Sequence, residues 1–154
     1  MSRADVTATL IGVGNPERGD DAVGLEIAAR LRERRLPGVE IFETSGDGAA
    51  LMELLKGRPR VFLFDAVRSG EPSGTVFRFD VGTQPLPATV AQASTHAFGV
   101  AEAIELARVV GSLPPTVILY GVEGACFELG AGLSPEVRAA VHEVVRRVLA
   151  ELGL

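Results

Sequence analysis

Short apolar runs rich in β-branched residues recur along the chain and predict five strands. The runs at 6–13, 60–67 and 116–122 are apolar along most of their length, which is typical of strands buried on both faces of a parallel sheet. The run at 75–80 instead alternates apolar and polar residues, which predicts an edge strand. With the β-branched run at 39–44, the predicted strands are 6–13, 39–44, 60–67, 75–80 and 116–122.

Amphipathic segments lie between these runs and predict four helices. In the first of them, Val23, Ile27 and Leu31 recur at a spacing of four and form an apolar stripe. The last begins with Ser134 and Pro135, residues that favour the cap and the first turn of a helix. The predicted helices are 21–35, 47–56, 95–110 and 134–152.

The alternation of strands and helices predicts an α/β fold in a single domain over residues 1–154. We expect a three-layer α/β/α arrangement around a twisted, mostly parallel five-stranded sheet with one antiparallel edge strand. A hydrophobic content of 47% is enough for a sizeable core and excludes wholesale disorder. The chain has no internal repeat or low-complexity tract.

Charge and cysteine content narrow the functional classes. The net charge is −5 and lysines and arginines do not cluster, which argues against nucleic acid or an anionic membrane as a partner. The single cysteine allows no intrachain disulfide and fits a reducing compartment. No apolar segment reaches the roughly 18 residues that a membrane span needs. We therefore expect a cytoplasmic protein.

The glycine-rich segment 12–24 joins the first strand to the first helix. A dinucleotide-binding loop would need glycine where Glu17 stands, and the Lys-Ser/Thr of a P-loop is absent. The segment instead carries two adjacent acids, Asp20 and Asp21, at the helix start. Helix capping is the ordinary explanation for Asp20 alone. It explains the pair less well, because the second carboxylate adds repulsion.

Two further residues could complete a site with Asp21. Asp65 ends the apolar run 60–67, at the position where open α/β sheets bind ligands, although an Asx turn is the simpler alternative. If the first and third strands are neighbours, Asp21 and Asp65 converge at one sheet edge. His96, at the start of the helix 95–110, could reach the same edge. Two carboxylates and an imidazole can ligate a divalent metal ion, whereas a lone histidine is more often a core or capping residue.

Two other candidates favour simpler interpretations. His142 shares a polar helix stripe with Arg138 and Arg146, so we expect it to be solvated. A nucleophilic Cys126 would need a base that only His96 could supply. We therefore expect Cys126 to be structural or incidental.

Taken together, four stretches resemble the hydrogenase maturation proteases, the endopeptidases that finish the large subunit of nickel–iron hydrogenases. Each stretch is weak by itself, but four in this order and at these separations are specific, and they extend over nearly the whole chain. They are 12–24; 64–67 with Gly70 and 72–74; 94–96 with Gly99 and 101–103; and 121–124 with 130–137.

The resemblance implies a twisted, mostly parallel sheet between helices and an endopeptidase activity. Its substrate would be the hydrogenase large-subunit precursor, whose C-terminal extension is removed after nickel insertion. The family's metal-contacting and catalytic residues fall on Asp21, Asp65 and His96. The nickel would belong to the substrate rather than to the enzyme. The chain departs from many members at Ala22, where they have glycine.

Two alternatives stay open on the same residues. One is a nickel-binding hydrogenase assembly factor without catalytic activity. The other is a metal-dependent hydrolase of small molecules.

Overall fold

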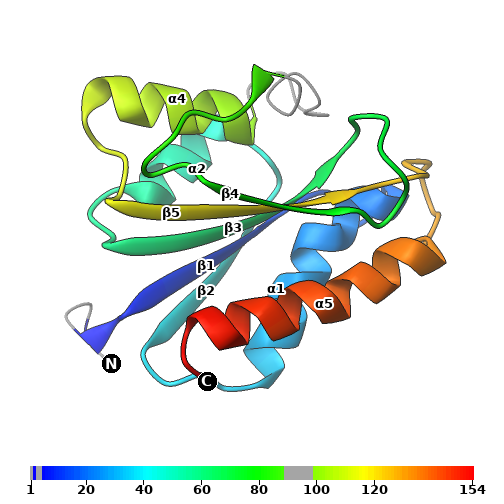
Figure 1. The fold of residues 1–154 in the computed structure, drawn as a ribbon, viewed down its shortest axis with the longest axis horizontal. Helices are drawn as coiled ribbons and strands as arrows, with labels where there is room; N and C mark the ends of the chain where they lie inside the picture. Colours follow the sequence, from blue (N-terminus) through cyan, green and yellow to red (C-terminus); the bar gives the residue numbers. More distant parts are fainter. Residues whose placement is uncertain (1, 3–4, 89–98) are drawn as a thin grey trace.

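A computed structural model describes residues 2, 5–88 and 99–154, and its centre is a five-stranded sheet (Figure 1). The strand order is β2-β1-β3-β5-β4. The strands are β1 (Ala8–Val13), β2 (Val39–Thr44), β3 (Arg60–Val67), β4 (Val76–Asp80) and β5 (Thr116–Glu123).

The sheet is parallel except at one edge, as the sequence predicts. Strands β1, β2, β3 and β5 pair in parallel, whereas β4 runs antiparallel to β5, with Val76 opposite Val122. Strand β1 lies directly beside β3, with Gly12 opposite Phe64. The loops that follow β1 and β3 therefore emerge side by side at the carboxyl edge of the sheet, which is the condition for Asp21 and Asp65 to converge.

Helices cover both faces of the sheet (Figure 1). Helices α1 (Val23–Glu33) and α5 (Pro135–Glu151) lie on one face, and α2 (Gly48–Leu55) and α4 (Val100–Val110) lie on the other. None of the helices in the described ranges combines the length and apolar character that a membrane span requires.

Two predicted helix starts differ from the structure. The first helix is preceded by a separate 3-10 turn, η2 (Gly19–Ala22), so Asp21 lies in this turn rather than in α1. The helix predicted at 95–110 begins at Val100, because the extended backbone of Gly99 precedes it and the Gly99 N–H donates to the Glu102 carboxylate at 3.1 Å. Residues 95–98, including His96, lie outside the described residues.

Two apolar clusters, one on each face, hold the layers together. Because side chains alternate along a strand, Phe62 and Phe64 of β3 pack towards α1 and α5, while Val61 and Leu63 pack towards α2 and α4. Asp65 continues the second series, at the point where the apolar surface of β3 reaches the carboxyl edge.

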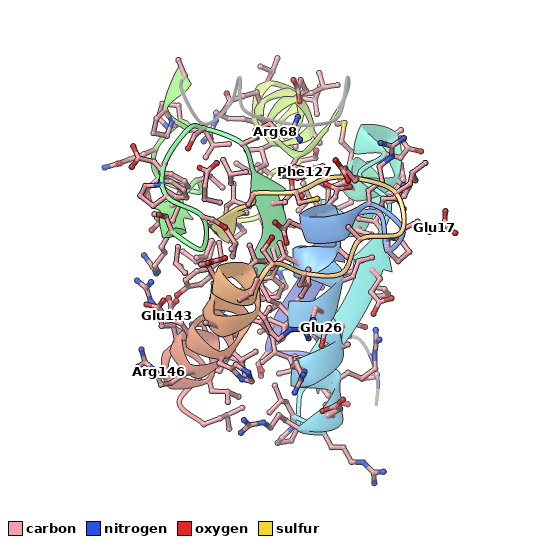
Figure 2. All side chains as sticks on the ribbon, turned by 90° about the vertical axis from the view of Figure 1, so that its right-hand side faces the viewer. Glu17, Glu26, Arg68, Phe127, Glu143 and Arg146 are labelled. Carbon is pink, nitrogen blue, oxygen red and sulfur yellow. The ribbon has the colours of Figure 1, made fainter. Side chains whose placement is uncertain are left out.

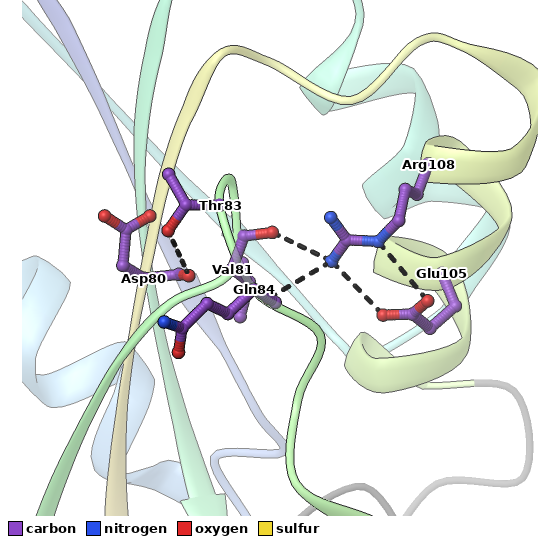
Figure 3. A network of polar contacts seen from close by, with 6 residues as sticks. All are labelled: Asp80, Val81, Thr83, Gln84, Glu105 and Arg108. Carbon is purple, nitrogen blue, oxygen red and sulfur yellow. Dashed lines mark hydrogen bonds and ion pairs between the residues drawn. The ribbon is translucent and has the colours of Figure 1, made fainter.

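Arg108 of α4 fastens the connection that follows β4 (Figure 3). Its Nη2 donates to the Val81 carbonyl at 2.8 Å and to the Gln84 carbonyl at 3.4 Å. The same guanidinium forms an ion pair with Glu105 at 3.3 Å. The turn after β4 is therefore held against the helix that packs on its face of the sheet.

Candidate active site

The carboxyl edge of the sheet holds two buried aspartates from neighbouring elements. Asp21 comes from the η2 turn and is 3% exposed, and Asp65 comes from β3 and is 7% exposed. The Asn15 N–H donates to the Asp21 Oδ2 at 3.1 Å, and the Ala66 N–H donates to the Asp65 Oδ1 at 2.9 Å. Figure 2 views the molecule from this edge. Both aspartates that the sequence nominates therefore lie where the strands end.

Glycines allow the start of α1 to approach the strand ends closely. A Cβ atom on Gly24 would lie 2.2 Å from the Phe64 carbonyl oxygen and 2.4 Å from that of Val13, and a Cβ on Gly14 would lie 2.0 Å from the Asp21 carbonyl oxygen. Real Cβ atoms do not make contacts this short. Any side chain at Gly24 would push α1, and with it the η2 turn, away from β1 and β3. The glycine spacing of segment 12–24 thus serves to bring Asp21 to β3.

The charge of Asp21 acts on the buried Asp65 carboxylate. Burial is the main cause that raises the pKa of Asp65 well above its usual range, the negative charge of Asp21 raises it further, and the hydrogen bond from the Ala66 N–H acts in the opposite direction. No cationic side chain of the described residues is among the influences on this pKa. Asp65 therefore lies in a setting that favours taking up a proton or binding a cation, and such settings are common at functional sites.

Asp20 does not cap the helix, so the simpler explanation of this residue is wrong. No side-chain cap bond is formed at the start of η2 or of α1. The Asp20 carboxylate instead accepts hydrogen bonds from the backbone N–H groups of Ala125, Cys126 and Ser134 and from the Ser134 hydroxyl, at 2.7–3.0 Å. These partners lie more than 100 residues away in the chain, which is why local sequence reasoning missed them.

Glu123 is a buried carboxylate at the same edge that the sequence analysis did not nominate for the site. It ends β5, is 2% exposed and accepts two hydrogen bonds from the Ser69 N–H, at 2.9 and 3.2 Å, and one from the Ser69 hydroxyl. The signal was available, since Glu123 follows an apolar run just as Asp65 does. Its carboxylate anchors the loop after β3.

Cys126 and His142 lie in the simpler settings that the sequence predicts. The backbone of Cys126 exchanges hydrogen bonds with Asp20 in both directions, which fits a structural role; its thiol is half-buried. His142 is exposed on α5, as expected. Within residues 2, 5–88 and 99–154, no three His, Cys, Asp or Glu side chains gather closely enough to hold a metal ion. The third predicted ligand, His96, lies outside this part of the chain.

Comparison with known proteins identifies the family. The family model described as "Hydrogenase maturation protease" (HycI) matches residues 25–151, most of the chain. The chain belongs to the hydrogenase maturation protease family. The match includes the positions of Asp65 and His96 and begins four residues after Asp21.

Individual relatives support the assignment to this family. The hydrogenase 2 maturation protease of Escherichia coli K12 is 31% identical over 147 residues, which are 93% of this chain and 88% of that protein. The structure of the hydrogenase maturating endopeptidase HybD from E. coli superposes with a TM-score of 0.80 at 26% identity, covering 94% of this chain and 91% of that one. A hydrogenase 2 maturation peptidase from a Thaumarchaeota archaeon gives 0.71 at 29% identity, covering 96% and 98%. The expected α/β fold and the assignment as a protease, hence a hydrolase, are confirmed.

Proposed function

We propose that this hydrogenase maturation protease removes the C-terminal extension of a nickel–iron hydrogenase large-subunit precursor after nickel has been inserted. The observation that carries the proposal is the pair of buried carboxylates, Asp21 and Asp65, at the sheet edge of a chain that belongs to this family. The E. coli relative is named for the maturation of hydrogenase 2. The cytoplasmic location expected from the single cysteine stays a prediction.

Nickel enters this proposal as part of the substrate. Asp65 is buried beside the negative charge of Asp21, a setting that a divalent cation stabilises, and carboxylate oxygens are suitable ligands. We propose that Asp21, Asp65 and His96 contact the nickel that the precursor carries. A set of three protein ligands leaves open positions, which the precursor's own ligands can fill.

In this scheme, hydrolysis adds a water oxygen to the carbonyl carbon of the scissile peptide bond. The C–N bond breaks, the acyl carbon keeps the water oxygen and becomes a new carboxylate, and the nitrogen takes up a proton and becomes a new amine. Contact with the nickel would keep Asp65 ionised, and its oxygen that does not contact the metal can accept a proton of the attacking water and return it to the leaving amine. Asp21, held by the Asn15 N–H, would orient the reacting groups.

The test is incubation of the protein with nickel-loaded and nickel-free precursor, followed by mass measurement of the large subunit. The proposal predicts loss of the C-terminal extension from the nickel-loaded form only. Asp65→Asn should abolish this loss, whereas Tyr120→Phe, which removes only the hydrogen bond to Glu151, should leave it intact. Equal processing of both precursor forms would refute the role of nickel. No processing of any precursor by the wild type would refute the proposed function.

A further inference from the structure

The Asp20 carboxylate is fully buried one residue before Asp21, and the proposed chemistry does not use it. Its Oδ2 accepts from the Ala125 N–H at 2.7 Å, the Cys126 N–H at 3.0 Å and the Ser134 hydroxyl at 2.7 Å, while Oδ1 accepts from the Ser134 N–H at 2.7 Å. One side chain thus binds both ends of the segment 124–134, which joins β5 to α5.

The segment 124–134 has no helix or strand of its own, so its shape depends on such contacts. The Asp20 N–H donates to the Cys126 carbonyl at 2.8 Å, and the Gly130 N–H donates to the Glu17 carbonyl at 2.9 Å. A Cβ atom on Gly19 would lie 2.4 Å from the Cys126 carbonyl oxygen. The loop before α1 and the segment 124–134 are therefore fitted closely together.

The segment also contacts the loop that follows β3. The Arg68 guanidinium lies 4.1 Å from the centre of the Phe127 ring, and Figure 2 shows the two side chains together at the carboxyl edge of the sheet. Immediately before the segment, Glu123 holds Ser69. Three loops around the Asp21–Asp65 pair are thus joined, and Leu129 of the segment stays 67% exposed.

We infer that Asp20 is a positioning residue, which holds segment 124–134 as a preformed wall against which the precursor polypeptide lies beside Asp21 and Asp65. This inference rests on the proposed function. A protease must fix an extended, flexible chain end, and a wall that is ordered before binding lowers the entropy cost of doing so.

The hydrogen bonds require a carboxylate rather than an amide. All four partners donate, and only an ionised carboxyl group offers acceptors on both oxygens. Burial raises the pKa of Asp20, but the hydrogen bonds from Cys126, Ser134 and Ala125 outweigh it and lower the pKa below its usual range. Asparagine at this position would turn an NH₂ group towards an N–H donor and release one part of the segment.

The experiment compares wild type, Asp20→Asn and Tyr120→Phe, all well below their melting temperatures. Tyr120→Phe is the matched control, since it removes one side-chain hydrogen bond, to Glu151 at the end of α5, and none to the segment 124–134. Hydrogen exchange followed by mass spectrometry reports on residues 124–134, and a precursor titration gives kcat and KM.

For Asp20→Asn we expect exchange in this segment to accelerate about tenfold or more. We also expect KM to rise about tenfold, as follows from a misplaced substrate contact. Loss of folded protein lowers the apparent kcat but leaves KM unchanged, so a rise in KM separates positioning from stability.

Each outcome bears on the inference separately. Faster exchange confined to 124–134 together with a raised KM, both absent from Tyr120→Phe, would support it. Unchanged exchange, or a KM equal to that of the control, would overturn it. If the wild type cleaves no precursor, the proposed function fails and the substrate part of the inference fails with it, while the exchange data still decide whether Asp20 orders the segment.

Discussion

The two ends of the sheet surround their acidic groups in opposite ways. At the end away from the aspartate pair, the Glu151 carboxylate accepts hydrogen bonds from Arg78, at 2.5 and 3.2 Å, and from the Tyr120 hydroxyl. The Arg60 guanidinium donates to the Glu151 carbonyl at 2.9 Å. At the carboxyl edge, Asp21 and Asp65 instead bring like charges together.

The pKa values reflect this contrast. Burial raises the pKa of Glu151, but hydrogen bonds from Arg78 and Tyr120 outweigh it and lower the pKa below its usual range. For Tyr120, burial and the bond to Glu151 raise the pKa to about 12. For Asp65, burial and the charge of Asp21 act in the same direction and raise the pKa. One end is therefore arranged for stability, whereas the other accepts a cost in stability of the kind that functional sites carry.

The largest effect is expected from neutralising either aspartate at the carboxyl edge. Asp21→Asn and Asp65→Asn should each lower the rate of precursor processing by about 10²–10⁴-fold, the range typical of losing an acid–base group. The fold should persist, because asparagine conserves the volume and the hydrogen bond to the neighbouring N–H. The mass of the large subunit and the circular dichroism of the variant measure the two effects. Full activity in either folded variant would remove that residue from the site.

Neutralising Glu151, at the other end of the sheet, should lower the stability of the fold and leave precursor processing unchanged. Glu151→Gln weakens hydrogen bonds from a charged and a neutral donor, so we expect the free energy of unfolding to fall by about 2 kcal/mol. In a domain of this size that lowers Tm by about 4–8 °C. Processing below the melting transition should stay at the wild-type rate. Thermal unfolding and the processing assay on one preparation check both, and an activity loss like that of Asp65→Asn would erase the distinction between the ends.

The pH dependence of stability should reveal the raised pKa of Asp65. Because the folded pKa of Asp65 is raised, the folded state binds more protons than the unfolded state between about pH 4 and that raised pKa. The wild type therefore loses stability as the pH rises through this window. Asp65→Asn lacks this loss, so its Tm should exceed that of the wild type by about 2–4 °C at neutral pH, the change that 1 kcal/mol produces.

The difference in Tm should shrink as the pH falls through the window towards pH 4, since position 65 then becomes neutral in the unfolded wild type as well. Melting curves of the two proteins from pH 4 to 8 measure it. A difference that stays constant with pH, or a less stable Asp65→Asn at neutral pH, would contradict the raised pKa.

The smallest effect is expected at Cys126. Its backbone, not its half-buried thiol, holds Asp20. Cys126→Ser should therefore change processing by less than about twofold and Tm by no more than the roughly 1–2 °C of a neutral substitution. Loss of cleavage in the folded variant would argue for a cysteine nucleophile.

The aspartate half of this contrast could be predicted from the sequence, because it depends on local patterns, whereas the partners of Glu151 are distant in the chain and were not predicted. The apolar runs identified the strands, and a carboxylate that ends such a run marked Asp65. Asp21 was predictable from its place after a glycine-spaced loop. The role of Asp20 was not, since its partners lie on a loop more than 100 residues away. Glu123 was overlooked for the site, and its pairing with Ser69 depends on the β3–β5 register, which local patterns do not specify.

The most direct test of the account is a titration of the Asp65 carboxyl group by carbon-13 NMR, in the wild type and in Asp21→Asn. The account predicts a midpoint well above the ordinary aspartate value of about 3.9 in the wild type. It also predicts a lower midpoint once the charge of Asp21 is removed, with Glu151 unaffected. An ordinary midpoint for Asp65, or one that does not respond to Asp21→Asn, would mean that the two carboxylates do not share a site.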